Sequence, residues 1–210
     1  MGKSVVASAL LALMLAEGAA AEYGRIPPTA IDPAALTIDE AEHLGRRLDG
    51  NIVLRGEDGA EFMLGSVLDK PLILVFSYYR CDGACPTLNR NLAKTILAAQ
   101  RFHPGEDYRV LTVSFDRNDG PEQLQHFVHH LELPAETRVG WRYAVVKQAE
   151  DLAAFTQSVG YKYFWSVRDK VFVHPNVLIF VTPDGRVARY LYGLSASPRD
   201  VELALIEANG

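Results

Sequence analysis

Two cysteines separated by three residues are the most reactive feature of this sequence. Cys81 and Cys85 are the only cysteines, so one pairing is available for an intramolecular disulfide. Gly83 lies between them and permits a tight loop, and Pro86 marks the first turn of an expected helix. The helix amino terminus should favour Cys85 as a thiolate, the form that attacks disulfides and binds soft metals. The pair therefore predicts thiol–disulfide exchange or metal binding, with a structural disulfide as the plainer alternative.

One histidine, His174, could add a third ligand to the two sulfurs. It precedes Pro175 and opens a predicted buried strand, so a loop would present it at the edge of a sheet. Two thiolates and one imidazole suit copper, because thiolate sulfur selects Cu(I) and imidazole tolerates both oxidation states. Position alone also leaves open a purely structural role for this histidine.

Five other polar residues are weaker candidates for a metal site or a docking surface. His126, His129 and His130 share one face of an expected helix, yet no cysteine or carboxylate completes a known metal pattern there, so a solvated face is the simpler interpretation. Asp116 and Asp119 follow a predicted core strand, on the same rim as the cysteine loop. They fit turn chemistry before the next helix, or an acidic patch that docks a partner.

The elements that must position these residues alternate between strands and helices. Buried strands are predicted from apolar runs at residues 71–77, 108–114 and 177–181, with a shorter strand at 143–146. Helices are expected after Pro86 and over residues 121–131, 148–159 and 198–208. Hairpins are indicated by turn signals between residues 51–54 and 61–64, and between 177–181 and 186–191. This order predicts one α/β layered domain with an amino-terminal hairpin.

The first 21 residues have the features of a secretory signal. A positive start precedes an apolar run too short to span a bilayer, and three alanines provide a cleavage site. We divide the chain into this signal at 1–21, which could be retained as an anchor, an extended leader at 22–49 and the domain at 50–210. Export to the periplasm would allow the cysteines to form a disulfide.

Composition excludes several classes of function. The 210 residues are 49% hydrophobic and 22% charged, as in a globular protein with a sizeable core. Lys and Arg number 21 against 26 Asp and Glu, a formal net charge of −5. Because no basic cluster accompanies this acidic balance, nucleic acid is not an expected partner.

These motifs resemble the SCO/SenC family, the thioredoxin-like copper proteins of cytochrome oxidase assembly. The resemblance covers most of the chain after residue 45. It is carried by the Cys81 and Cys85 pair with Pro86, by His174, and by residues 72–80, 113–116, 182–186 and 189–193. Three residues separate the two cysteines, whereas thioredoxins have two between theirs.

The resemblance implies a thioredoxin-like fold, with a central mixed sheet flanked by helices, and copper as Cu(I) or Cu(II) held by Cys81, Cys85 and His174. It implies delivery of that copper to the CuA centre of cytochrome c oxidase subunit II, or to another copper-site client near the membrane. A periplasmic thiol reductant or copper donor would be a further partner. The alternative is an enzyme, a thiol–disulfide oxidoreductase that uses Cys81 and Cys85 as its redox pair and includes the CuA-site cysteines among its substrates.

The chain departs from the family pattern beside the expected ligands. Asp82 replaces the proline that usually follows the first cysteine, and its carboxylate should oppose a thiolate but favour a bound cation. Val173 stands where many members have an aspartate before the histidine, so the usual partner of the imidazole is missing at that position. Asp116 and Asp119 are also one residue closer together than is common.

Overall fold

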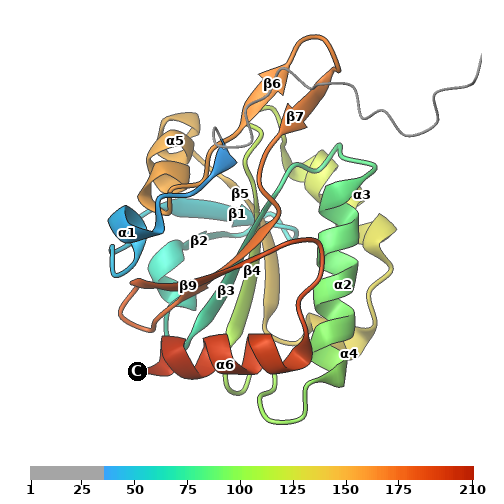
Figure 1. Cartoon of the computed structure of the whole chain (residues 1–210). Helices are drawn as coiled ribbons and strands as arrows, with labels where there is room; N and C mark the ends of the chain where they lie inside the picture. The colour runs from blue at the N-terminus through green and yellow to red at the C-terminus, as the bar shows by residue number, and fades with distance from the viewer. Residues whose placement is uncertain (1–35) are drawn as a thin grey trace, which may run out of the picture. The chain divides into compact units, whose positions relative to one another are not determined.

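A seven-stranded sheet with helices on both faces forms the centre of the protein (Figure 1). The computed structural model describes residues 36–210. The sheet contains β1 (Val53–Gly56), β2 (Glu61–Met63), β3 (Leu72–Ser77), β4 (Arg109–Ser114), β5 (Trp141–Val146), β8 (Val177–Val181) and β9 (Val187–Tyr192). The helices are α1 (Glu40–His43), the 3-10 helix η2 (Leu64–Val67), α2 (Ala84–Ala98), α3 (Pro121–Leu131), α4 (Ala135–Arg138), α5 (Ala149–Ser158) and α6 (Pro198–Asn209). A separate hairpin comprises β6 (Phe164–Ser166) and β7 (Val171–Val173).

The sheet is mixed, and its strand order is β2-β1-β5-β4-β3-β8-β9. Strand β4 runs parallel to both β3 and β5, whereas β8 is antiparallel to β3 and to β9. Strand β1 pairs antiparallel with β2 and with β5. The predicted mixed sheet flanked by helices is therefore confirmed. Because β3 and β4 are parallel neighbours, the segments that follow them emerge at the same edge of the sheet.

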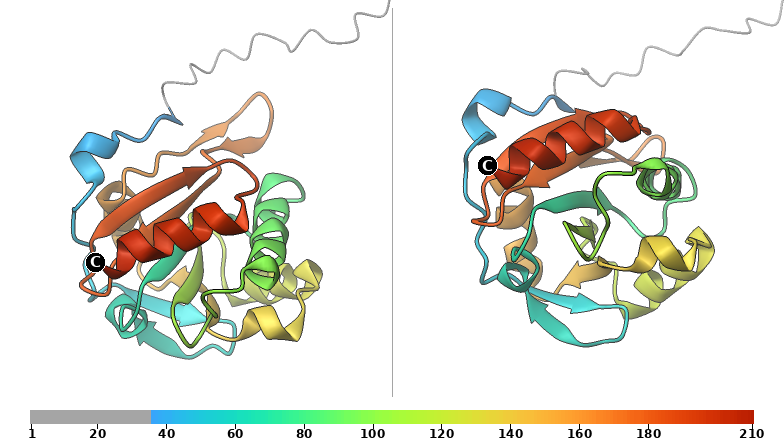
Figure 2. Two further views of the ribbon diagram at one scale, coloured as in Figure 1. Left: turned by 60° about the horizontal axis from the view of Figure 1, so that its bottom comes forward. Right: turned by 90° about the horizontal axis from the view of Figure 1, so that it is seen from below.

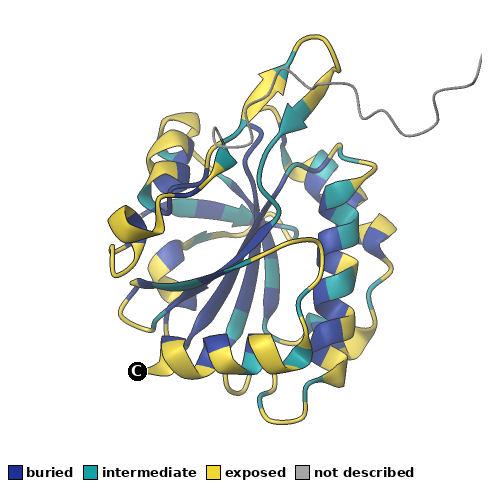
Figure 3. Cartoon of the chain, viewed as in Figure 1, coloured by how far each residue is buried: buried dark blue, intermediate teal, exposed yellow. Residues whose placement is uncertain are grey.

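All six residues of β3 are buried (Figure 3), and burial on both faces explains why the strand is apolar from Leu72 to Phe76. Successive side chains of a strand point to opposite faces. Ile73 and Val75 pack in the cluster that includes apolar side chains of α2, α3 and α6. Leu74 and Phe76 pack in the second cluster, with residues of η2 and α5. Figure 2 shows α6 alongside the strand β9, which it contacts.

Residues 36–49, which the sequence interpretation placed in an extended leader, pack against the sheet. Ile38 and Leu48 are buried. The backbone of this segment pairs with β9: the amide of Gly45 donates to the carbonyl of Val187, whose own amide donates to Arg46. The signal predicted at residues 1–21 lies outside the described residues. Within 36–210 no helix is both long enough and apolar enough to cross a membrane.

The β6–β7 hairpin projects from the end of the molecule where β3 and β4 finish (Figure 1). Its Phe172 ring packs edge-on against Tyr78, with centroids 5.1 Å apart. Trp165 also packs edge-on against Phe172, with centroids 5.0 Å apart, and remains about half exposed. The hairpin therefore lies at the end of the sheet where the cysteine loop follows β3.

Candidate metal centre

The cysteine loop connects β3 to α2 at the carboxyl edge of the sheet. Cys85 is in the first turn of α2 and is buried, whereas Cys81 is half-buried in the preceding loop. Both cysteines are reduced in this structure. The two thiols therefore lie close together in the sequence, just after β3 ends at Ser77.

The negative charge of the pair belongs to Cys81. The thiol of Cys85 donates a hydrogen bond to the Cys81 sulfur, and the backbone amides of Cys85 and Gly83 point to the same atom. These donors lower the pKa of Cys81 to about 5. The same hydrogen bond, together with burial, raises the pKa of Cys85 above its ordinary value. The sequence favoured a thiolate at Cys85 because of the helix terminus; the structure instead makes Cys85 the proton donor.

His174 lies beside the buried cysteine, immediately after β7. Its Nε2 atom is 3.7 Å from the Cys85 sulfur. Its ring packs against Phe115, with centroids 5.0 Å apart. Burial lowers the pKa of His174 below its ordinary value, so the imidazole is neutral at neutral pH. A neutral imidazole is the form that binds a metal.

Tyr161 supplies the polar partner that Val173 cannot provide. Its hydroxyl lies 3.0 Å from Nδ1 of His174, and the carbonyl oxygen of Pro175 lies 3.1 Å from the same nitrogen. Two oxygen acceptors at Nδ1 favour the proton on that nitrogen and leave the lone pair of Nε2 facing Cys85. No motif in the sequence marks Tyr161 for this role, because it is 13 residues from His174 and belongs to a different segment.

The distance between sulfur and nitrogen fits two ligands of one metal ion. With metal–sulfur and metal–nitrogen bonds of about 2.3 and 2.05 Å, two ligands of a trigonal ion are separated by about 3.8 Å. The observed Cys85–His174 separation is 3.7 Å. Within residues 36–210, no three His, Cys, Asp or Glu side chains already form a metal cluster. Binding an ion through Cys81 as well therefore requires side chains to adjust around the other two.

The two aspartates on the rim are held by internal hydrogen bonds. Each is only 8% exposed. One Asp119 oxygen accepts from the amide of Tyr79 at 2.7 Å and from the hydroxyl of Ser114 at 2.6 Å, so it anchors the segment that leads to Cys81. Asp116 accepts from the backbone and side-chain nitrogens of Asn118. Neither carboxylate is presented as the exposed acidic patch that the sequence suggested.

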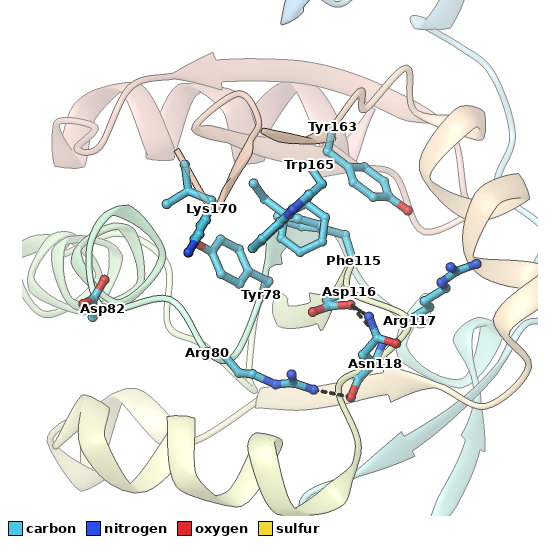
Figure 4. A pocket seen from close by; sticks show the side chains of 12 residues that line it. Tyr78, Arg80, Asp82, Phe115, Asp116, Arg117, Asn118, Tyr163, Trp165 and Lys170 are labelled. Carbon is cyan, nitrogen blue, oxygen red and sulfur yellow. Dashed lines mark hydrogen bonds between the residues drawn. The ribbon is translucent and has the colours of Figure 1, made fainter. Parts of the chain in front are cut away.

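An aromatic pocket of about 900 Å³ opens beside the cysteine loop (Figure 4). Its rings come from the ends of β3 and β4 and from the segment around the hairpin: Tyr78, Phe115, Tyr163, Trp165 and Phe172. Arg117 and Lys170 add positive charge to the lining, and Arg80 donates to the carbonyl of Asn118 at 2.6 Å. The pocket is thus mainly apolar and carries both signs of charge, since Asp82 and Asp116 also line it.

The histidines of α3 form a separate group. His126, His129 and His130 are exposed. The rings of His126 and His130 stack with centroids 3.9 Å apart, and Nδ1 of His130 donates to the carbonyl of His126. Among residues 36–210, the rings of these three histidines contact one another and do not contact the cysteine pair.

Comparison with known proteins places this chain among thioredoxin-like proteins of one family. The SCO1/SenC family model matches residues 40–206. One similar crystal structure is that of a protein from Aquifex aeolicus VF5 that has been described as a candidate electron transfer protein. It is 30% identical to this chain, with a TM-score of 0.72, and the match covers 80% of this chain and 95% of that one. No curated protein matches the sequence.

Two more distant structures share the fold. Copper-bound ScoI of Arabidopsis thaliana is 20% identical, with a TM-score of 0.60 over 76% of this chain and 97% of that one. The thioredoxin domain of a thiol-disulfide oxidoreductase from Bacteroides vulgatus is 18% identical, with a TM-score of 0.52 over 77% and 97%. The predicted thioredoxin-like fold is confirmed by these matches.

Proposed function

Because the chain belongs to the SCO1/SenC family, we propose that it binds copper through Cys81, Cys85 and His174 and serves in the assembly of cytochrome c oxidase. The observation that carries this proposal is the pairing of a buried sulfur with a neutral imidazole nitrogen at 3.7 Å, beside a thiolate. Soft sulfur and imidazole together suit copper in both of its biological oxidation states. Copper bound to a fold relative, ScoI of Arabidopsis thaliana, supports the same cargo.

Each ligand would have a distinct part in copper capture. Cys81 offers a thiolate at neutral pH and is accessible, so it would make the first contact with the ion. Cys85 would then lose its proton, because a metal-bound thiol is deprotonated. His174 would complete the site through Nε2, with its other nitrogen held by Tyr161 and Pro175. The half-exposed position of Cys81 would let a client's ligands reach the ion and take it over.

We propose that the client is the CuA centre of cytochrome c oxidase subunit II, or a similar copper site near the membrane. The location would be the periplasm, reached through the signal at residues 1–21. A copper donor or a thiol reductant of that compartment would reset the protein after delivery, because a Cys81–Cys85 disulfide cannot bind the ion.

A Cu(I) titration of the reduced protein against a competing chelator tests the ligand set. We expect one equivalent of tightly bound copper, weakened at least tenfold in His174→Ala and lost in Cys81→Ser/Cys85→Ser. His130→Ala is the matched control, since it removes an exposed imidazole on α3 whose ring contacts, among residues 36–210, are with His126 and His129. Absence of tight binding by the reduced wild type would overturn the proposal.

The alternative function is thiol–disulfide exchange by the same cysteines. A specific observation favours it: an accessible thiolate with a pKa of about 5 stands beside a buried thiol that could resolve a mixed disulfide. Exchange needs no imidazole ligand. An exchange rate that is unchanged in His174→Ala, together with no copper binding by the wild type, would establish this function in place of the first.

A further inference from the structure

Three histidines on the outer face of α3 form a group that the proposed copper site does not use. His126, His129 and His130 are all exposed. The opposite face of the helix packs in the core through Leu124, Phe127, Val128 and Leu131. Because the core uses only that opposite face, the arrangement of the three imidazole rings needs an explanation of its own.

Two of the three rings form a close pair. His126 and His130 are four residues apart, so their side chains lie next to each other on one side of the helix. Their rings stack with centroids 3.9 Å apart and an angle of 25° between the ring planes. The ring of His129 is outside this stack, with its centroid 5.4 Å from that of His130 and an interplanar angle of 61°. The pair that can act together is therefore His126 and His130.

A hydrogen bond fixes which nitrogen of His130 is able to bind an ion. Nδ1 of His130 lies 2.8 Å from the backbone carbonyl oxygen of His126. A carbonyl oxygen only accepts, so Nδ1 carries the hydrogen, and the lone pair of the neutral ring is then on Nε2. Histidines that bind metal ions commonly donate their other ring nitrogen to a backbone carbonyl in this way. The hydrogen bond therefore prepares Nε2 of His130 as a ligand.

The spacing of the two rings is close to what one ion requires. Two imidazole nitrogens at about 2.05 Å from one ion are separated by about 2.9 Å at a right angle and by about 3.3 Å at a tetrahedral angle. The rings of the pair are 3.9 Å apart and both side chains are exposed. Small rotations of the two side chains therefore bring both Nε2 atoms to one ion without moving the helix. Two histidines four residues apart on one helix face are a known zinc-binding arrangement.

The last turn of α3, which carries His130, is held in place from α2. Arg90 donates to the carbonyl of His130 at 2.6 Å and to that of Leu131 at 3.3 Å. Both carbonyls are among the last four of the helix, which have no partner within it. These hydrogen bonds oppose fraying of the helix end. The two imidazoles are therefore carried on a rigid backbone, which lowers the entropy cost of bringing both to one ion.

We propose that His126 and His130 form a second metal site, which takes divalent ions such as Cu(II) and Zn(II) with water as the remaining ligands. Imidazole suits these ions, and Cu(II) should bind most tightly among the divalent ions of the first transition row. The pair lacks the thiolate that selects Cu(I), so His130→Ala stays a control for the Cu(I) titration. The site is separate from the cysteines, because Pro121 begins α3 and His130 is about 14 Å farther along the helix.

Titration of Cu(II) into untagged Cys81→Ser/Cys85→Ser protein at pH 7.5 tests the α3 site alone, because both sulfurs of the first site are removed. Calorimetry should show one equivalent of bound Cu(II), and the electron paramagnetic resonance spectrum should show coupling to two imidazole nitrogens. We expect His126→Ala and His130→Ala each to weaken the affinity at least about tenfold, because a second ligand on the same helix acts at a high effective concentration. Zn(II) should bind the same pair more weakly than Cu(II).

His129→Ala is the matched control, since it removes an exposed imidazole from the same helix but one that is outside the stack. It should leave the Cu(II) affinity within about twofold of the cysteine-free parent. All three histidines are exposed, so none of these variants disturbs the core. The proposal is overturned if the parent shows only adventitious binding without a defined stoichiometry, or if His129→Ala weakens binding as much as His130→Ala does.

Thermal unfolding with Zn(II) gives a second readout that does not use copper. An ion that binds only the folded protein stabilises it by mass action, and here it would also clamp the last turn of α3. Zn(II) should raise the unfolding midpoint of the cysteine-free protein and should not raise that of His126→Ala in the same background. An equal rise in both proteins would assign the zinc to other residues and overturn the proposal. Because both cysteines are absent, the outcome is independent of the proposed copper site.

Discussion

The two sulfurs of the candidate site differ in chemistry because their surroundings differ. Cys81 is half-exposed and receives hydrogen bonds, whereas Cys85 is buried and donates one. Burial disfavours a charge and donated hydrogen bonds favour it. The exposed sulfur is therefore the nucleophile, and the buried sulfur is its proton donor.

Alkylation of the reduced protein by iodoacetamide should follow the Cys81 thiolate. Because the pKa of Cys81 is about 5, we expect the rate to reach half its maximum near pH 5 and to be nearly constant from pH 7 to pH 8. Mass spectrometry should place the modification on Cys81. Reaction mainly at Cys85, or a midpoint near the ordinary thiol pKa of about 8.5, would contradict this assignment.

Tyr161 should matter to copper through its hydroxyl rather than its ring. Tyr161→Phe keeps the packing but removes an acceptor from Nδ1 of His174, and loss of such a partner typically weakens metal binding by about 10–100-fold. A competitive Cu(I) titration measures the affinity, and the nitrogen hyperfine coupling of the Cu(II) form should also change. Tyr163→Phe is the control, because Tyr163 packs beside Tyr161 but makes no hydrogen bond to His174 among the described contacts. Equal affinities of Tyr161→Phe and the wild type would exclude this role.

At the scale of elements, the amino-terminal segment is held against α5 at one close contact. Gly160 has a φ of +67°, and a Cβ there would lie 2.8 Å from Cγ2 of Ile38 and 2.9 Å from Nδ1 of His43. His43 is buried and its two ring nitrogens face the carbonyls of Asp39 and Gln157. A side chain at Gly160 would therefore push the segment away from the domain.

Gly160→Ala should destabilise the fold by about 1–3 kcal/mol, from left-handed backbone strain and from the displaced segment. Gly59→Ala separates the two causes, because Gly59 has a φ of +77° with no atom within 4 Å of the added Cβ. Urea unfolding of both variants gives the free energies. Limited proteolysis should cut residues 37–48 faster in Gly160→Ala only. Equal losses in the two variants would mean that the segment adds no packing at this point.

The sequence predicts those elements that carry a full local signal, such as an apolar run of strand length or a proline at the start of a helix. The strand β3 is apolar from Leu72 to Phe76, and Pro121 and Pro198 mark the starts of α3 and α6, where the structure begins both helices. The β6–β7 hairpin is not predicted, because three-residue strands contain too few alternations to be recognised. Its pairing depends on contacts of Phe172 with Tyr78 and Phe115, which only the folded chain brings together.

The same limit applies to the candidate site. Cys81, Cys85 and His174 are marked by residue type and spacing, and the structure brings Cys85 and His174 together. Asp119 has the right residue type for a docking patch, but its carboxylate turns inward to the amide of Tyr79. Sequence spacing shows which strand end carries a carboxylate and not which way it faces. The role of Tyr161 cannot be predicted from the sequence, because no motif marks this residue and its contact with His174 forms only in the folded protein.

At the scale of the whole molecule, two apolar clusters on opposite faces of one sheet converge where the cysteine loop leaves β3. Cys85 belongs to the cluster under α2, whereas Tyr161 belongs to the cluster on the other face. His174 lies between them, in contact with Cys85 on one side and Tyr161 on the other. The geometry of the site therefore depends on both apolar clusters. The free energy of unfolding should consequently depend on whether His174 is protonated.

The folded protein should lose stability in mild acid partly through His174. Its pKa is lowered by burial in the folded state, so the unfolded chain binds a proton at a higher pH than the folded one does. The contribution of His174 to the free energy of unfolding is therefore complete above the ordinary histidine pKa of about 6.5. It falls as the pH drops toward the lower pKa of His174 in the folded protein, by at most about 1.4 kcal/mol per pH unit. His174→Gln, which has no such proton, should lose less unfolding free energy than the wild type between pH 7.5 and pH 5.5 in urea titrations. His130→Gln removes an exposed histidine instead and should follow the wild type; identical pH profiles of the wild type and His174→Gln would show that the buried imidazole does not contribute.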